Sequence, residues 1–501
     1  MTTAVRLGPP PANAVHPLDG FGAQLNTNLF ITRGRTAGEP RRLTAAQLAA
    51  LQTVIDRLKP GLSRILVRRG LNPGTPQGRS APQFVALMKT IELAQQAGVD
   101  LNLTWWGQGP YAVERRLRGL KWPNRSFRDW PDPHRRKWPP ELTDPGGITA
   151  PRHQMTRFAG IVEEARRRGL DCVGNVTIQN EVNAGSVDIA KQGDQFISMR
   201  FYELLYRYLD AELRSRPDPQ NPEQTLRDTV QFVVGDLVER GNSPQDAWLR
   251  YLHRNMELPR DHFRSVLDAY SIHVYWEPGP GRQGFPQKLQ TRLTNLEGTV
   301  RSLGIRKPVY VTEFGVRKLH AQPHPGRLDG VRIEETTEAA FQHAWFIALA
   351  PQYGCTGLSK WVLYRTDLRA DFGEWGMIGP SRTQFQRFPT YRVIRLFDHV
   401  VPRGWKAGGL GRVAGGIIAS RFAAPDDSQE SVMVLNNSTR SRSVKIEGLM
   451  ESHRYFVVDW NRDGRGLLDP RPPIQSDATG AATVSVPRHG LVALSTLPPG
   501  L

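Results

Sequence analysis

The sequence has few of the features that mark several well-defined functional classes. Cys172 and Cys355 are its only cysteines, too few for a disulfide framework and without the C-x-x-C spacing of a metal site. No apolar run approaches the roughly 20 residues that a membrane span needs. The motifs H-x-H and H-E-x-x-H and a Gly-rich phosphate loop are also missing. These absences argue against a membrane protein and a metal or nucleotide enzyme, and they imply no cofactor.

The first twenty residues, MTTAVRLGPPPANAVHPLDG, contain no apolar segment of the kind that a signal peptide requires. This favours the cytoplasm over export, although a signal peptide already removed would leave the same sequence. Nothing in the sequence bears on the oligomeric state.

Lysine is scarce beside arginine, with 11 Lys and 55 Arg in a chain of net charge +18. Such a charge is compatible with an anionic partner such as nucleic acid, anionic lipid or an acidic polysaccharide. The competing explanation is a GC-rich genome, which enriches arginine without functional pressure. Because the charge is spread along the whole chain instead of clustered, nucleic acid is disfavoured as a partner.

Short apolar runs alternate with amphipathic segments from residue 18 to residue 400. This rhythm is typical of parallel strands joined by helices. Eight strands separated by helices predict a (β/α)8 barrel with long insertions, whereas an open doubly wound sheet would be expected to carry a G-x-G-x-x-G turn. The predicted strands are residues 20–25, 63–68, 100–105, 174–180, 231–236, 270–275, 308–313 and 357–362.

Residues 401–501 have a different character, with short β-branched runs separated by turn residues. This pattern predicts a compact all-β sandwich of about 100 residues. The N-terminal segment 1–17 contains TAVRLG, which could add a strand to the sandwich before the chain enters the barrel.

One insertion, Tyr111 to Pro140, combines nine Lys or Arg with Trp122, Trp130 and Trp138. On a barrel this loop would lie over the C-terminal face, where active sites form. Its aromatic side chains could stack on sugar rings and its arginines could bind carboxylate or sulfate. An equally good explanation is that the tryptophans only fix a long loop to the barrel.

Two predicted strands, the fourth and the seventh, end in glutamate, with Glu181 in TIQNE and Glu313 in VYVTEFG. Their side chains should converge across the mouth of a barrel. Two such carboxylates are what glycoside cleavage needs, one to protonate the leaving oxygen and one to meet the anomeric carbon. Taken singly, Glu181 could instead cap a helix and Glu313 could pair with an arginine of the wall.

The pair Asn180-Glu181 and the second glutamate Glu313 resemble the retaining glycoside hydrolases of clan A. A β-sandwich after the barrel is also similar to families 30, 39, 51 and 79 of that clan. The resemblance implies that Glu181 is the acid/base and Glu313 the nucleophile, with the pKa of Glu181 raised by burial and by the charge of Glu313. Val182 stands where many relatives have proline, so the resemblance does not extend to one family.

The resemblance implies further substrate-binding residues. Asn180 would bind a sugar hydroxyl, Trp361 would floor the sugar subsite, and Arg68 and Tyr275 would keep Glu313 ionised.

Each of these assignments has an alternative. A register slip would replace Arg68 by Arg64 or Arg69. His273, on the strand with Tyr275, could bind substrate or be a core histidine, and Trp361 could simply fill the barrel.

Trp105, at the end of the third strand, is a further candidate for substrate binding. Asp236 and Gln108 also follow strands, but nothing singles them out.

The sequence therefore predicts a retaining O-glycosyl hydrolase acting on a glycoside, oligosaccharide or polysaccharide, with an acidic glycan as one candidate. The alternative of another class is a barrel that binds glycans without cleaving them. Such a protein would keep the aromatic residues but could dispense with one of Glu181 and Glu313.

Overall fold

The computed structural model describes most of the barrel and the sandwich. It covers residues 2–10, 16–26, 30, 32–33, 40–41, 43–68, 71–106, 151–183, 199–239, 244–259, 264–277, 284–317, 327–328, 331–364, 375–379, 384–413, 416–461 and 466–500. The basic insertion 111–140, Gln108 and Arg69 lie outside these residues. Within them, no helix is long and apolar enough to cross a membrane.

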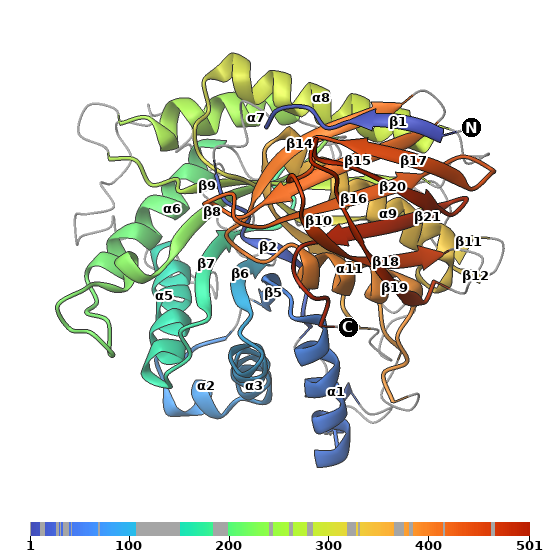
Figure 1. Cartoon of the computed structure of the whole chain (residues 1–501). Helices are drawn as coiled ribbons and strands as arrows, with labels where there is room; N and C mark the ends of the chain where they lie inside the picture. The colour runs from blue at the N-terminus through green and yellow to red at the C-terminus, as the bar shows by residue number, and fades with distance from the viewer. Residues whose placement is uncertain are drawn as a thin grey trace.

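The core of the fold is a parallel sheet of eight strands in the described part of the chain (Figure 1). All eight predicted strands are present, and the predicted (β/α)8 architecture is confirmed. In spatial order they are β2 (Gly20–Ala23), β13 (Cys355–Lys360), β10 (Val309–Val316), β9 (Ala269–Trp276), β8 (Gln231–Val238), β7 (Val173–Ile178), β6 (Asp100–Trp106) and β5 (Leu62–Arg68).

The sheet closes where β2 meets β5. Leu25 and Ile65 form a parallel bridge, and the N–H of Leu25 donates to the carbonyl of Arg64 at 2.8 Å. A Cβ on Gly22 would lie 1.9 Å from the carbonyl oxygen of Leu62, so only glycine allows this approach of the two backbones.

Helices cover the outside of the sheet, as the apolar periodicity predicts. In α1, Thr44 and Gln47 form a capping box at the start, while Leu51, Val54, Ile55 and Leu58 are buried along one face. The longer helices are α1 (Ala45–Leu58), α3 (Pro82–Gln96), α5 (Pro151–Arg167), α6 (Met199–Arg214), α7 (Gln245–Leu252), α8 (Phe285–Leu303), α9 (Thr337–Leu349) and α11 (Pro389–Val400), with a short α2 (Pro76–Ser80).

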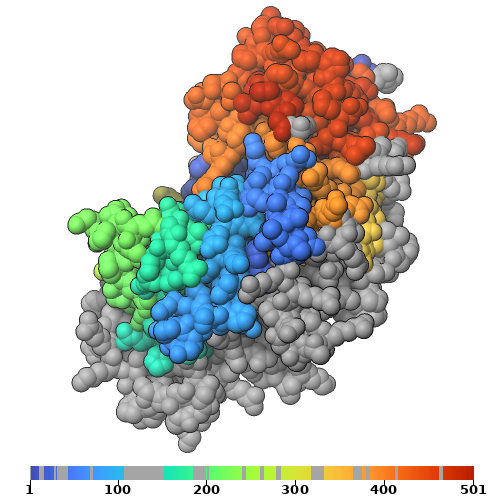
Figure 2. Space-filling view, turned by 90° about the horizontal axis from the view of Figure 1, so that it is seen from below, coloured from blue at the N-terminus to red at the C-terminus, as the bar shows by residue number. Residues whose placement is uncertain are grey.

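The C-terminal part is a β-sandwich of two sheets, which Figure 2 shows at one end of the molecule in orange and red. The larger sheet has the order β14-β15-β16-β21-β18-β19, and the smaller has the order β1-β17-β20. Their bounds are β1 (Thr2–Arg6), β14 (Lys406–Val413), β15 (Ile417–Ala423), β16 (Glu430–Asn436), β17 (Arg442–Glu447), β18 (Arg454–Asn461), β19 (Leu468–Gln475), β20 (Ala481–Val486) and β21 (Gly490–Ser495).

The start of the chain belongs to this sandwich, because β1 pairs in parallel with β17 from Thr2 opposite Ser443 to Arg6 opposite Glu447. The larger sheet packs on the barrel helices. Phe341 of α9 stacks on Trp460 of β18 with ring centroids 6.4 Å apart. The barrel and the sandwich therefore share one continuous apolar contact.

Gly22→Ala should destabilise the protein by about 2 to 3 kcal/mol, because the new methyl group would force β2 away from β5 at the closure of the barrel. Chemical denaturation with a linear extrapolation would measure the loss. Gly174→Ala is the matched control, since a Cβ there meets nothing within 4 Å. Equal unfolding free energies for the two variants would contradict the account of barrel closure.

Candidate active site

The turn after β7 presents Asn180 and Glu181 to the mouth of the barrel. Gln179 and Glu181 have the positive φ angles of 63° and 50° that reverse the chain there. Asn183 anchors the turn to β8: its side-chain amide donates to the carbonyl of Val238 at 2.7 Å and accepts from the N–H of Val238 at 2.8 Å. Asn183 thus holds the turn that carries Glu181 against β8.

Glu313 lies within β10 on the face that points into the barrel. Its carboxylate accepts a hydrogen bond from the hydroxyl of Tyr275 at 2.7 Å and forms a buried ion pair with the guanidinium of Arg64. The Glu313 side chain is only 4% exposed. Neighbours from β9 and β5 therefore hold it in one position.

The arginine that contacts Glu313 is Arg64, one of the two alternatives to Arg68 that the sequence left open. Residues 64, 66 and 68 of β5 share a face because side chains alternate along a strand. The sequence pattern therefore predicts the face on which the arginine lies but not its position along the strand. The side chain of Arg68 is outside the described part of the structure. Arg64 is fully buried and donates to the side chains of Glu313, Asp236, Asn180 and Thr104, the last at 2.8 Å.

Asp236 is a third carboxylate of the site, which the sequence named without a role. It follows Gly235, whose φ is 132°, at an irregularity in the pairing of β8 with β9. The bulge turns the Asp236 side chain inward, where it pairs with Arg64 and accepts from the hydroxyl of Thr312 at 2.5 Å. Burial raises the pKa of Asp236, but the charges of Arg64 and His273 outweigh it and hold the pKa well below its usual range.

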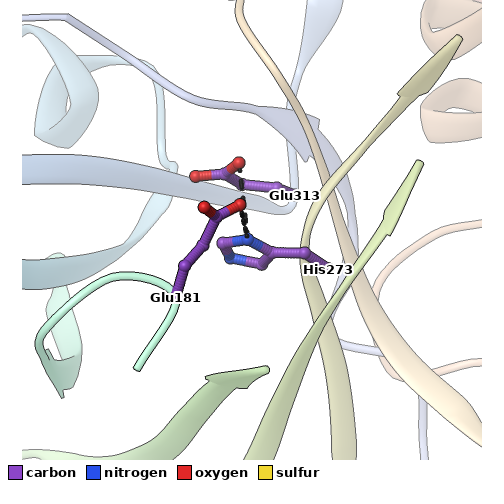
Figure 3. A group of neighbouring side chains, drawn as sticks. All are labelled: Glu181, His273 and Glu313. Carbon is purple, nitrogen blue, oxygen red and sulfur yellow. Dashed lines mark hydrogen bonds and ion pairs between the residues drawn. The ribbon is translucent and has the colours of Figure 1, made fainter. Parts of the chain in front are cut away.

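His273 lies near three carboxylates, and Figure 3 shows it with two of them, Glu181 and Glu313. Its Nδ1 lies 3.1 Å from Glu181 and 3.5 Å from Glu313, and its Nε2 lies 3.7 Å from Asp236. Burial alone would lower the pKa of the imidazole, but the three carboxylates outweigh burial and raise the pKa to about 9. His273 is therefore a buried cation at neutral pH and not a neutral core histidine.

The expectation that Glu181 has a raised pKa is wrong, because the pKa of Glu181 is lowered. Burial does raise the pKa of Glu181, but its hydrogen bond with His273 and the charges of His273, Arg317 and Arg64 outweigh burial and lower it. The error came from treating Glu313 as the main neighbour of Glu181, whereas the cationic imidazole of His273 lies 3.1 Å from its carboxylate.

One carboxylate oxygen of Glu181, one of Glu313 and a ring nitrogen of His273 lie within 4.8 Å of one another. The three residue types could ligate a metal ion, but the charges around them oppose it. His273 is protonated at neutral pH, and Glu313 already forms an ion pair with Arg64. The electrostatics of the triad fit a bound proton better than a divalent cation.

An aromatic wall lies beside Glu313. Tyr275, Trp361 and Val362 form a cluster with the partly buried Leu66 and Trp375. Trp361, predicted within the eighth strand, directly follows it and is 8% exposed. Trp375 was missed, because it lies fourteen residues later in the chain with no strand pattern to locate it.

The structure does not bring Trp105 to the site. Its ring packs on Phe158 of α5 with centroids 5.3 Å apart and is buried in the core between sheet and helices. Trp106 lies instead on the strand face of Thr104, which contacts Arg64. An error of one residue in a strand exchanges the two faces of the sheet.

Comparison with solved structures gives the same architecture over the whole chain. A family 30 subfamily 8 xylanase from Clostridium acetobutylicum aligns with a TM-score of 0.59 and 12% identity over 99% of both chains. A family 30 xylanase from Talaromyces cellulolyticus gives 0.60 and 11% over 98% of this chain and 99% of its own. An endo-β-1,6-glucanase gives 0.58 and 14% over 99% and 95%.

The chain shares the fold of these enzymes. This confirms the predicted resemblance to clan A glycoside hydrolases at the level of the fold. No family model and no curated protein matches the chain. At such low identity, the roles of individual residues must be argued from the site itself.

The raised pKa of His273 predicts how stability depends on pH. The folded state keeps the imidazole proton up to a pKa of about 9, whereas the unfolded state loses it near 6.5. The stabilisation is therefore complete below about pH 6.5 and is lost as the pH rises through 9, by up to about 1 kcal/mol per pH unit.

Urea denaturation of the wild type and His273→Gln between pH 6 and pH 10 would measure this effect. The wild type should lose stability over the window more steeply than the variant. His453→Gln, which changes an exposed histidine of the sandwich, should follow the wild type. Parallel curves for all three proteins would show that His273 is not a cation in the folded state.

Proposed function

We propose that the protein is a glycoside hydrolase that cleaves O-glycosidic bonds by double displacement with retention of configuration. The observation that carries the proposal is the pair of carboxylates after β7 and in β10, Glu181 and Glu313, with oxygens within 4.8 Å of each other. Retaining glycosidases hold their two carboxyl groups roughly 5 to 5.5 Å apart, whereas inverting enzymes leave roughly 6.5 to 9.5 Å for a water molecule.

Glu313 has the environment of a nucleophile. The ion pair with Arg64 and the hydrogen bond from Tyr275 fix its carboxylate beside the aromatic wall, where a sugar ring could stack. In the first step an oxygen of Glu313 would attack the anomeric carbon while the bond to the leaving oxygen breaks, giving a glycosyl ester. In the second step water would displace Glu313 from that carbon.

Glu181 would act as acid and then as base. It would donate its proton to the leaving oxygen in the first step and take one from the attacking water in the second. Before the reaction the proton would be held by the pair formed by Glu181 and His273, which are 3.1 Å apart. Because this proton is shared, the two residues titrate as a unit, and the acid form of Glu181 is drawn from His273.

A carbohydrate is the proposed substrate. The compared structures are described as xylanases and a β-1,6-glucanase, which makes a polysaccharide or oligosaccharide a reasonable substrate class for this chain. A barrel that binds glycans without cleaving them is the second candidate, and the aromatic wall would serve it equally. It gives no reason for two facing carboxylates tied to Arg64 and His273.

Replacing either glutamate should have a distinct kinetic effect on a panel of nitrophenyl glycosides that includes pyranosides, furanosides and uronides. Glu313→Gln should lose several orders of magnitude in kcat/KM on every substrate, because the ester cannot form. Glu181→Gln should lower kcat/KM by about 10² to 10⁴ on natural glycosides. The first step on nitrophenyl glycosides should slow far less, because their leaving group departs without protonation. Glu451→Gln, an exposed change in the sandwich, is the charge-matched control.

Full activity of Glu313→Gln on the sugar that the wild type cleaves would refute the assignment of the nucleophile. Failure of the wild type on both the panel and polysaccharides, combined with glycan binding, would favour the non-catalytic barrel.

The spacing of the two carboxylates predicts the stereochemistry of the product. Proton NMR of the reaction during its first minutes should show the anomer with the configuration of the substrate before mutarotation adds the other. Initial appearance of the opposite anomer would exclude attack by Glu313 and would require a water molecule between the two carboxylates.

A further inference from the structure

Arg317 lies at the mouth of the barrel, one residue past β10 and four residues after Glu313. Its backbone N–H donates to the carbonyl of Trp276 at 2.9 Å. Its guanidinium carbon lies 4.4 Å from the centroid of the Tyr275 ring, whose hydroxyl donates to Glu313. One tyrosine side chain therefore separates the Arg317 guanidinium from the carboxylate that meets the anomeric carbon.

Arg317 differs from Arg64 and Arg292, the other arginines around Tyr275, in forming no ion pair with a carboxylate of the described residues. Arg64 pairs with Glu313 and Asp236. Arg292 pairs with Glu239 and donates to the carbonyl of Tyr275. The Nε of Arg317 is shielded from solvent and has no hydrogen-bond partner in the described part of the chain.

An arginine N–H group shielded from water without an acceptor is unfavourable, and such groups are normally paired. The nearby Arg292 adds to the positive charge, and its pKa is lowered to about 10 by burial and by the charge of Arg317. A guanidinium presents donors in a planar fork that matches carboxylate and sulfate oxygens. A carboxylate or a sulfate would therefore satisfy these donors and offset the positive charge.

We infer that Arg317 binds an anionic group, a uronate carboxylate or a sulfate ester, on the sugar held beside Glu313 or on the next sugar of the chain. This inference rests on the proposed function and names its substrate class. It gives the acidic glycan, which the sequence suggested through the insertion 111–140, a specific contact in the described site.

The bound anion would also assist the chemistry. The charge of Arg317 is one of those that lower the pKa of Glu181, together with those of His273 and Arg64. An anion on Arg317 offsets this charge, so a substrate that carries one moves Glu181 toward the protonated form that the first step consumes.

The test compares matched pairs of polysaccharides. Glucuronoxylan, polygalacturonate, hyaluronate and heparin would each be offered beside a carboxyl-reduced form, and heparin also beside its desulfated form. Release of reducing ends by the wild type, Arg317→Gln, Arg317→Lys and Arg301→Gln would give kcat/KM for each polymer. Arg301, exposed near the end of α8, controls for the lost net charge.

The wild type and Arg301→Gln should prefer the anionic member of at least one pair by about tenfold to hundredfold, as expected for a charged hydrogen bond. Arg317→Gln should bring this ratio close to one, and Arg317→Lys should lie between. Loss of preference on carboxyl reduction identifies a uronate, and loss on desulfation identifies a sulfate ester. Cleavage without an anionic preference, or a preference that Arg317→Gln retains, would overturn the inference while leaving the hydrolase proposal intact.

Calorimetric measurement of binding, with oligosaccharides from the same polymers, distinguishes failure of the hydrolase proposal from failure of the anion site. Binding that needs the anion and is weakened in Arg317→Gln, without any cleavage, would uphold the anion site and refute the hydrolase. Neither binding nor cleavage of any member would overturn both.

Discussion

The guanidinium of Arg64 is the contact on which the arrangement of the site depends. From β5 it reaches β6 through Thr104, β8 through Asp236 and β10 through Glu313, and it also contacts Asn180 after β7. Five parts of the barrel wall are thus tied to one planar group. A buried cation is tolerated only when its donors are used, and here each bond also fixes a residue at the mouth. The hydrogen bonds that make the charge tolerable also hold Glu313 and Asn180, the residue next to Glu181, in place.

Positive and negative charges alternate through the site, from Asp236 to Arg64 to Glu313 and from Glu313 to His273 to Glu181. In such a row of charges, groups that interact strongly do not titrate independently, because the protonation of one changes the free energy of protonating its neighbour. The hydrogen bond between Glu181 and His273 contributes both to the lowered pKa of Glu181 and, after the charge of Glu313 and the hydrogen bond with Asp236, to the raised pKa of His273. Consumption of the Glu313 charge in a covalent step would weaken the hold of His273 on its proton and so change every other member.

The sequence was enough to predict the eight strands, because apolar runs bounded by turns and separated by amphipathic helices have few other solutions. It also selected Glu181 and Glu313, of which Glu181 follows β7 as expected, whereas Glu313 lies inside β10, which continues three residues beyond the predicted end. It could not give depth along a strand, which is why Arg68 stood for Arg64. It could not detect the bulge that turns Asp236 inward, and it selected Trp105, although its neighbour Trp106 shares the inner face. These details depend on register and backbone irregularity, which are decided by contacts between distant segments.

The five residues of β1 have a consequence for the order in which the molecule is completed. The partner of β1 is β17, more than four hundred positions further along the chain. During synthesis the first strand leaves the ribosome long before β17 exists, and it stays an unsatisfied edge while the whole barrel is made. The smaller sheet of the sandwich can form only after β17 and β20 have been synthesised, so it joins segments more than four hundred residues apart late in folding. Contacts between segments so far apart in the sequence favour slow folding, and β1 can pair only once β17 is available.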